Sequence, residues 1–165
     1  MKSFQWALLL SLTLLSSCGF YLRGLSPNGP QWIDSIAIVV ENNRNDLDGL
    51  LGERLQAYNI PVCLDPAQAH YWLIIQNTEF RQQISSISSS TTPRQYQLTY
   101  TVWFKFQTRQ GLEIIPLHPV QVMRQITLNS DRILGSEGEE ATFRNEMRRD
   151  ATVQILTQLS HLKVG

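Results

Sequence analysis

The sequence predicts an α+β fold, with a mostly antiparallel, four-stranded sheet and two helices packed on one of its faces. Residues 95–106 alternate between apolar and polar side chains, as a strand with one buried face does. Residues 46–58 and 139–162 instead carry apolar side chains at three- and four-residue spacing, which indicates amphipathic helices. The order strand, helix, strands, helix allows both helices to cover the same face.

The first strand and the first helix are expected near the start of the domain. Residues 35–40, with the sequence SIAIVV, form a short apolar run that is typical of a buried strand. The helix over 46–58 begins at Asn45 or Asp46, which both suit an N-cap, and the asparagine and proline that follow it end it. Its apolar stripe comprises Leu47, Leu50, Leu51, Leu55 and Tyr58. We expect a short strand afterwards, over 62–64.

Two longer strands are expected around a polar tip. The second strand covers 70–80 and continues toward Ile84. A serine- and threonine-rich tract over 85–92 predicts a mobile tip between this strand and the next. The third strand covers 95–106. Its apolar face is formed by Tyr96, Leu98, Tyr100, Val102, Phe104 and Phe106.

The fourth strand is expected in two pieces, 112–117 and 120–128. Pro116 and Pro119 interrupt it, and proline is tolerated in sheets mainly at an edge or a bulge. A polar loop over 129–138 then leads to the last helix. The stripe of this helix comprises Phe143, Met147, Ala151, Ile155, Leu159 and Leu162.

A short apolar segment that leads to Cys18 predicts export and lipidation. Residues 6–15 read WALLLSLTLL, which suits a secretory signal and is too short for the ~20 residues of a bilayer span. Small residues at Ser16 and Ser17 suit cleavage before Cys18, as in a bacterial lipobox. Acyl chains on the new N-terminal cysteine would hold the protein at a membrane surface. Gly19, in place of an aspartate that retains such proteins at the inner membrane, favours the outer membrane, facing the periplasm. The alternatives are an ordinary signal peptide and an uncleaved anchor.

These boundaries divide the chain into three parts. Residues 1–17 are the expected lipoprotein signal peptide, 18–32 the lipidated N-terminus and linker, and 33–165 a single α+β domain. Cleavage removes Lys2 and leaves 13 basic residues against 14 acidic ones. Such a near-neutral protein does not fit a nucleic-acid-binding function, which requires a strongly basic surface.

No arrangement of residues in the sequence points to catalysis or to a metal. His70, His118 and His161 lie far apart and form no metal-ligand spacing. No nucleophile elbow or phosphate-binding glycine loop occurs. Cys63 has no partner once Cys18 is acylated, and its apolar surroundings predict a small buried side chain. We therefore expect neither an enzyme nor a cofactor.

Residues 18–24, CGFYLRG, resemble the N-terminal signature of the LptE family of lipopolysaccharide-assembly lipoproteins. In that family a lipidated cysteine is followed by glycine, an aromatic pair or similar, and then Leu-Arg. The layout of strands and helices is also similar, and Tyr96-Gln97 falls where family members tend to carry the same pair. The resemblance implies an outer-membrane lipoprotein that plugs the β-barrel of its partner LptD and helps the barrel to assemble. The alternating Gln and Thr side chains suit a polar barrel lumen.

The resemblance also implies contacts with lipopolysaccharide through basic side chains, because charge-assisted hydrogen bonds hold phosphates. Family members carry such residues in the loop between the second and third strands and in the loop before the last helix. Here the first loop has Arg81 and Arg94 only at its margins, and the second loop offers Arg132. These three arginines are the candidate lipopolysaccharide-binding residues, and solvated surface charges are the alternative.

A lipoprotein of another class is the alternative function. It would face the periplasm as a pilotin-like chaperone or as an auxiliary subunit of a lipid-transport system. A lipid carrier requires a large dry cavity between the sheet and the helices, whereas a filled core favours the plug.

Overall fold

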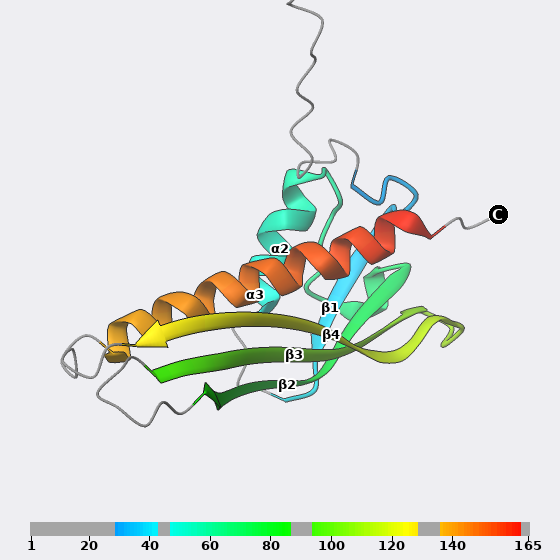
Figure 1. Ribbon diagram of the computed structural model, residues 1–165. Helices are drawn as coiled ribbons and strands as arrows, with labels where there is room; N and C mark the ends of the chain where they lie inside the picture. Colours follow the sequence, from blue (N-terminus) through cyan, green and yellow to red (C-terminus); the bar gives the residue numbers. More distant parts are fainter. Residues whose placement is uncertain (1–28, 43–46, 87–93, 129–135, 163–165) are drawn as a thin grey trace, which may run out of the picture.

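The protein has the α+β fold that the sequence predicts (Figure 1). The computed structural model describes residues 29–42, 47–86, 94–128 and 136–162. The tip predicted over 85–92 therefore lies largely outside the described residues, as do the N-cap candidates Asn45 and Asp46. The elements in chain order are β1 (Ile36–Val40), α2 (Leu47–Ala57), the 3₁₀ helix η2 (Pro66–Gln68), β2 (Tyr71–Ser86), β3 (Arg94–Thr108), β4 (Glu113–Leu128) and α3 (Ser136–His161).

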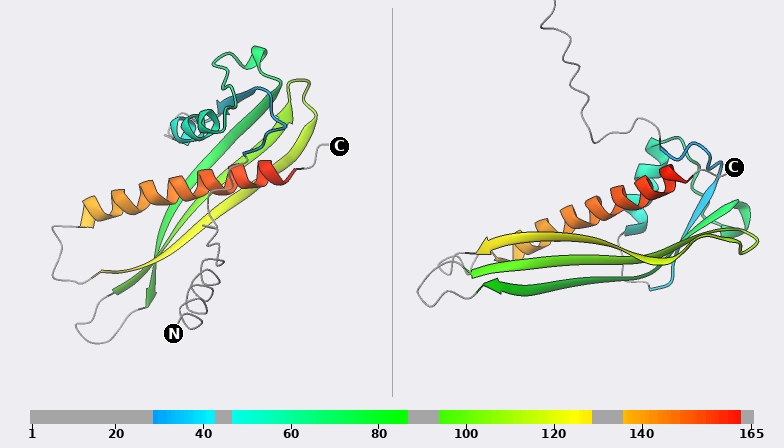
Figure 2. Two further views of the ribbon diagram at one scale, coloured as in Figure 1. Left: turned by 90° about the horizontal axis from the view of Figure 1, so that it is seen from above. Right: turned by 45° about the vertical axis from the view of Figure 1, so that its right-hand side comes forward.

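The four strands form one sheet in the order β1-β2-β3-β4. The short β1 runs parallel to β2 and pairs with Tyr71–Ile75 only, while β2–β3 and β3–β4 are antiparallel. One end of the sheet, where β3 turns into β4, is called the proximal end below. The distal end, where β2 and β4 stop and β3 begins, consists of three strands (Figure 2).

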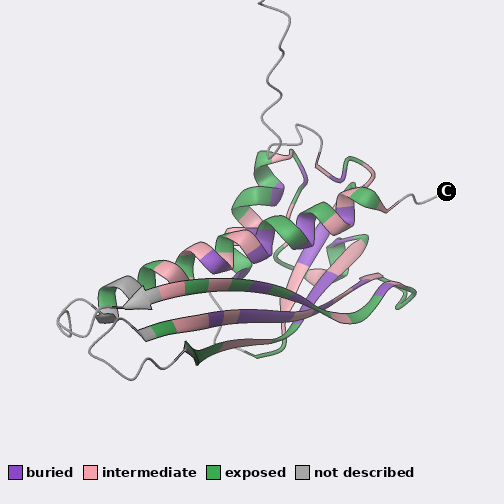
Figure 3. Cartoon of the chain, in the orientation of Figure 1, coloured by how far each residue is buried: buried purple, intermediate pink, exposed green. Residues whose placement is uncertain are grey.

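The core lies between the sheet and the two helices, which cover the same face (Figure 3). The alternation predicted for β3 is confirmed, because the side chains of one phase are almost fully buried and those of the other are not. The buried residues of β3 are Leu98, Tyr100, Val102, Phe104 and Phe106, together with Thr101 from the other phase. The burial of one face explains why this strand has the clearest period in the sequence.

Both helices bury most of the stripe that their spacing predicts, although Leu50 and Tyr58 of the first stripe are only half-buried. In α2 the buried residues are Leu47, Leu51 and Leu55. The helix ends where Asn59 adopts a left-handed φ of 60°, which lets the N–H of Ile60 donate to the carbonyl of Leu55 at 3.0 Å. In α3 the buried stripe includes Met147, Ala151, Ile155 and Leu159, with Phe143 and Leu162 packed beside them. No described helix is apolar over a stretch that would cross a bilayer.

Three local expectations from the sequence are wrong. No strand forms over 62–64, since Val62 makes only an isolated bridge with Ile36. The two pieces of the fourth strand form one continuous strand, β4, in which register shifts opposite Phe104–Gln107 accommodate the region of the prolines at the sheet edge. The side chain of Cys63 is half-buried instead of buried, because it lies in the segment along the outer edge of β1.

The segment before β1 packs at the proximal end. The indole N–H of Trp32 donates to the carbonyl of Leu159 in α3 at 3.0 Å. The same ring makes edge contacts with Tyr71 and Phe106, at 5.3 and 5.7 Å between centroids. The chain therefore joins the domain between the C-terminal end of α3 and the first residue of β2.

Candidate functional site

The structure describes only part of the predicted site. Cys18 and Arg132 lie outside the described residues. Arg94 is the first residue of β3 and pairs in register with Leu128, the last residue of β4. The loop that carries Arg132 therefore starts next to the backbone of Arg94, at the distal end of the sheet.

Arg81 lies apart from this end. It pairs in register with Thr99, five residues along β3 from Arg94, which corresponds to about 17 Å at a rise of ~3.4 Å per residue. Its side chain is exposed and forms an ion pair with Glu79, with 2.5 Å between Nε and Oε1. The hydrogen bond and the charge of Glu79 raise the pKa of Arg81. Arg81 is thus already neutralised by a neighbour on its own strand.

The sheet face that the helices leave open mixes polar and apolar side chains and carries few charges. It forms a shallow depression of about 430 Å³. We call this surface the outer face, and it comprises Glu79, Arg81, Gln83, Gln97, Thr99, Thr101, Trp103, Pro119, Gln121 and Met123. The only charged side chains among these residues, those of Glu79 and Arg81, form the ion pair just described.

Hydrogen bonds between strands order the amide groups on this side of the sheet. The side-chain amide of Gln121 donates to Thr101 at 3.3 Å, and that of Gln97 donates to the sulfur of Met123 at 3.4 Å. Amides and hydroxyls keep further donors and acceptors after one such bond. The outer face can therefore form many hydrogen bonds with a polar surface without the cost of burying an unpaired charge.

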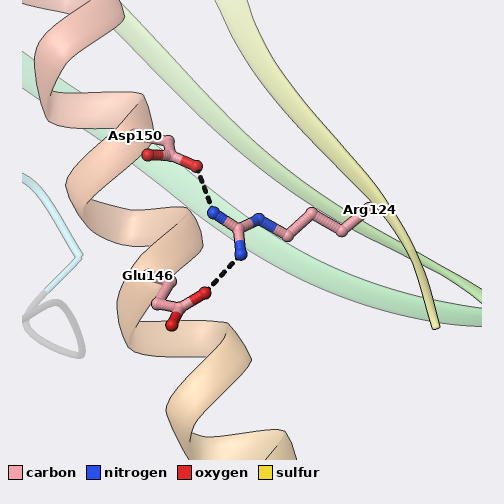
Figure 4. Close-up of polar contacts among 3 residues, drawn as sticks. All are labelled: Arg124, Glu146 and Asp150. Carbon is pink, nitrogen blue, oxygen red and sulfur yellow. Dashed lines mark hydrogen bonds and ion pairs between the residues drawn. The ribbon is translucent and has the colours of Figure 1, made fainter.

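Charged groups hold the N-terminal half of α3 on the distal part of the sheet. Arg124 of β4 donates to the carboxylates of Glu146 and Asp150, with 2.7 Å between Nη2 and Oδ2 of Asp150 (Figure 4). The hydrogen bond to Asp150 raises the pKa of Arg124 against an opposing effect of desolvation, and Glu146 adds to the increase. We call these three residues the Arg124 clasp.

A second arginine fixes the opposite side of the same helix. The guanidinium of Arg144 lies over the ring of Phe80 in β2, at 4.4 Å from its centroid, and pairs with Glu140 at 2.6 Å. Because Arg124 binds α3 from β4 and Arg144 reaches β2, the helix is held over the middle strand from both sides.

Sequence reasoning missed the Arg124 clasp, although the sequence carries a signal for it. Arg124 occupies the phase of β4 that also contains the buried Val120 and Val122, so a charge stands where an apolar residue is expected. Glu146 and Asp150 are four residues apart on one side of a helix. A charge in an apolar phase predicts a buried or half-buried partner of opposite sign.

His70 and His118 contact different partners. His70 pairs with Asp34 at 2.5 Å near the proximal end, while His118 contacts Gln158 of α3 at 2.7 Å and packs on Phe104. Desolvation would raise the pKa of Asp34, but the hydrogen bond and charge of His70 outweigh it and lower this pKa. Within the described parts of the chain, no group of three or more His, Cys, Asp or Glu side chains could hold a metal ion.

Comparisons with known proteins show the fold in several bacterial lipoproteins. A minor lipoprotein from Acinetobacter baumannii is 20% identical, with a TM-score of 0.64 over 78% of this chain and 91% of that one. A lipoprotein B from Nitrosomonas europaea is 23% identical, with a TM-score of 0.69 over 86% and 90% of the two chains. The rare lipoprotein B from Shewanella oneidensis is 17% identical, with a TM-score of 0.66 over 76% and 93%.

A search of curated proteins finds no match. The model of the LptE family, described as lipopolysaccharide-assembly, matches residues 33–159, which include every described strand and nearly all of α3. The chain therefore belongs to the LptE family of lipopolysaccharide-assembly proteins.

Proposed function

We propose that this protein is an outer-membrane lipoprotein that acts with the β-barrel LptD in lipopolysaccharide assembly. Residues 1–17 are removed, Cys18 is acylated, and the domain plugs the barrel from its periplasmic side and helps it to assemble. The protein has no enzymatic activity and needs no cofactor in this role. The family match over residues 33–159 carries the proposal.

The filled core supports a plug over a lipid carrier. A continuous cluster of buried side chains occupies the space between the sheet and the helices, including Phe104 and Phe106 from β3 and Met147 and Ile155 from α3, all at 0% exposure. A carrier would need an apolar cavity in this layer to enclose acyl chains. The two described depressions, on the outer face and along α3, are instead open to solvent and partly polar.

The outer face supports placement in a barrel lumen. The lumen of an outer-membrane barrel is polar, whereas its lipid-facing side is apolar. The outer face combines amides, hydroxyls and one internally neutralised ion pair with the apolar side chains of Trp103, Pro119 and Met123. Its polar part suits such surroundings. In the lumen the outer face exchanges hydrogen bonds with water for hydrogen bonds with the barrel wall, and neither of its charged side chains is left without a partner.

The length of the sheet also suits this role. At ~3.3 Å per residue, the 16 residues of β4 span about 53 Å. The apolar band of an outer-membrane barrel is only ~25 Å tall. A domain of this length extends through the band and still leaves its proximal part in the periplasm.

Contact with lipopolysaccharide is proposed for the distal end. Arg94 pairs in register with Leu128, and Arg132 follows Leu128 four residues later in the sequence. We propose these two arginines as its basic contacts. Arg81 contributes less, since Glu79 already neutralises it. Guanidinium groups bind phosphate through paired N–H donors, which suits the phosphorylated head of the glycolipid.

Affinity purification from detergent-solubilised outer membranes tests the complex. The mature protein should co-purify with a large β-barrel at equal stoichiometry, and mass spectrometry should find an acylated N-terminal cysteine. Depletion of the protein should reduce the amount of correctly assembled barrel. A barrel that assembles normally without this protein would contradict the assembly role.

Arginine variants test the glycolipid contact separately. The double variant Arg94→Ala with Arg132→Ala should weaken binding of purified lipopolysaccharide, and Arg81→Ala should have a smaller effect. Arg109→Ala is the matched control, because Arg109 is an exposed arginine at the proximal end that donates to the carbonyl of Ala67 at 3.1 Å. The control removes one positive charge and the double variant removes two. A loss of binding in the control of about half that in the double variant would show that only overall charge matters.

A further inference from the structure

The distal part of β2 has an open edge. β1 pairs only with Tyr71–Ile75, so no described strand lies beside Glu79–Ile84 on the side away from β3. We call Glu79–Ile84 the open edge, and Figure 1 shows it at the lower margin of the sheet. In an edge strand, about half of the backbone N–H and C=O groups point away from the neighbouring strand, where they can bond to water or to another strand.

The open edge lacks the usual features that prevent a free edge from pairing. Such edges commonly carry proline, lysine or a bulge. The open edge reads EFRQQI, and its pairing with β3 is regular, with register shifts only before it and at its end. Its two charged side chains, Glu79 and Arg81, lie on the outer face and neutralise each other. The backbone of this stretch is therefore able to accept a further strand.

The inner side of the open edge is only partly covered. Phe80 is half-buried, and Ile84, which occupies the same phase of the strand, is 51% exposed. On β4 the inner-phase Val120 and Val122 are only 2% and 6% exposed. The helix layer thus covers the β4 side of the distal sheet and leaves apolar surface accessible on the β2 side.

Helix α3 carries an excess of positive charge next to this surface. The guanidinium of Arg144 lies 4.4 Å from the ring centroid of Phe80. A depression of about 350 Å³ beside it is lined by α3 alone, through Glu140, Ala141, Arg144, Asn145 and Arg148. Glu140 pairs with Arg144, but Nε of Arg144 is buried and has no hydrogen-bond partner among the described residues. Two positive charges therefore face one negative charge there, and a buried donor lacks an acceptor.

We infer that an extended segment of the barrel partner adds to the open edge as a further strand. This inference rests on the proposed complex with the barrel and identifies one contact within it. Main-chain hydrogen bonds supply affinity in such strand addition, and alternate side chains supply specificity. The new strand would lie in the plane of the sheet, so the outer face stays free to meet the barrel wall.

The side chains around the open edge specify the segment. In a paired strand, the residue opposite Phe80 has its Cβ about 4.5–5.5 Å away, which brings it within reach of the Arg144 guanidinium. An acidic side chain at this position would supply the missing acceptor and balance the charge. The residue opposite Ile84, four positions along the same face, should be apolar.

A second copy of this chain fits the open edge less well. If two open edges paired with each other, the inner-phase residues of the added strand would be Phe80, Gln82 and Ile84, and none of these is acidic. The positive depressions of the two copies would then approach each other without a counter-charge. Charge complementarity therefore favours the barrel segment.

Hydrogen–deuterium exchange tests strand addition in the intact complex. In the free protein at low concentration, the outward-pointing amides of the open edge should exchange rapidly. In the purified complex their exchange should slow by about tenfold or more, as a newly formed hydrogen bond requires. Tyr71–Ile75 is the matched control, because β1 already pairs with it, so its exchange should change little.

A photocross-linking residue in place of Gln82 identifies the occupant. It should link to one segment of the barrel, in which an acidic and an apolar residue lie four positions apart. The same cross-linker in place of Gln56, an exposed residue of α2, should not link to that segment. A cross-link from position 82 to another copy of this chain within the complex would overturn the inference.

Substitutions then test the two side-chain contacts. Ile84→Lys should lower the cross-link yield several-fold, whereas Val153→Lys, at a residue of α3 that is 38% exposed, should not. Arg144→Glu should also lower the yield, and replacement of the linked acidic residue of the barrel by arginine should restore it. Circular dichroism confirms that each variant is folded. Absence of this rescue would contradict the charge pairing.

Co-purification separates this inference from the proposed function. If the barrel co-purifies and the exchange of Glu79–Ile84 is unchanged, the complex stands and the strand addition is wrong. If no barrel co-purifies, the proposed function is wrong and the inference falls with it.

Discussion

Replacement of Arg124 by methionine should loosen α3 from the distal part of the sheet. Methionine keeps an unbranched apolar stem in the phase of β4 that holds the buried Val122, so the substitution removes the charge and little packing. It leaves Glu146 and Asp150 without their shared partner. Because these two side chains are 46% and 48% exposed, water can solvate them in the variant.

The expected loss of stability follows from this partial exposure. Fully buried charged hydrogen bonds contribute about 1.5–3 kcal/mol each, and exposed ion pairs about 0.2–1 kcal/mol. The side chain of Arg124 is 32% exposed and forms two ion pairs. Because water screens both pairs, the contribution of each should lie near the range of exposed ion pairs. The free energy of unfolding should fall by about 0.5–2 kcal/mol, which for a domain of this size lowers the Tm by roughly 2–6 °C.

Urea unfolding, followed by tryptophan fluorescence, measures this loss. Arg149→Met is the matched control, since Arg149 is exposed on the same helix and forms no ion pair with another described residue. The control should change the free energy of unfolding by less than about 0.5 kcal/mol. At about 1 M salt, where the Debye length is ~3 Å, the difference between the wild type and Arg124→Met should shrink.

A double-mutant cycle decides whether the clasp itself is responsible. Arg124→Met and Asp150→Asn should be less than additive, because each removes one charge of the same ion pair. A coupling energy of zero would refute the reasoning, since the loss in the single variant would then come from packing alone. A loss that does not depend on salt would lead to the same conclusion.

Four further substitutions test other parts of the fold. Gly49→Ala and Gly52→Ala should each stabilise the protein by about 0.5–1 kcal/mol in urea unfolding, because an added Cβ meets nothing within 4 Å in α2. Ile155→Ala should cost about 2–5 kcal/mol, because its fully buried side chain would leave a cavity, and a small loss would show that the core collapses. Asp34→Asn should remove a contribution to the free energy of unfolding that is below about 1 kcal/mol, because Asp34 and His70 are both about 60% exposed. This contribution is present above pH 3.8 and is lost as the pH falls through the lowered pKa of Asp34 in the folded protein. The free energy of unfolding should therefore fall less steeply with acid in the variant, and identical curves for the two proteins would contradict a role for His70.

The sequence correctly predicted those helices and strands that have one solvent-exposed side and one buried side. The alternation of β3 and the stripe of α3 arise because a single core lies between them, so burial repeats with the local period of the chain. The fourth strand was harder to predict. The local sequence pattern predicts breaks at Pro116 and Pro119. A strand at the edge of a sheet, however, has no partner on one side and tolerates a missing N–H there.

The site was less predictable because its parts are set by tertiary contacts. The spacing of Arg124, Glu146 and Asp150 in sequence does not show that a strand and a helix will bring them together. The ion pair of Arg81 with Glu79 is local by contrast, because residues two apart on the predicted strand share a face, and it could have been read from the sequence. The half-buried state of Cys63 also depends on the segment along β1.

The brevity of β1 has a cost for the isolated molecule. Among the described strands, β1 pairs with Tyr71–Ile75 only, so the part of β2 beyond Ile75 has no described strand beside it on that side. β4 is the edge strand on the other side, so the distal end of the described sheet has an edge strand on each side. Such edges can pair with an extended segment of another copy. A copy that is enclosed in a β-barrel would have these edges kept apart from those of other copies. Without the barrel, and at high concentration, the protein should therefore self-associate.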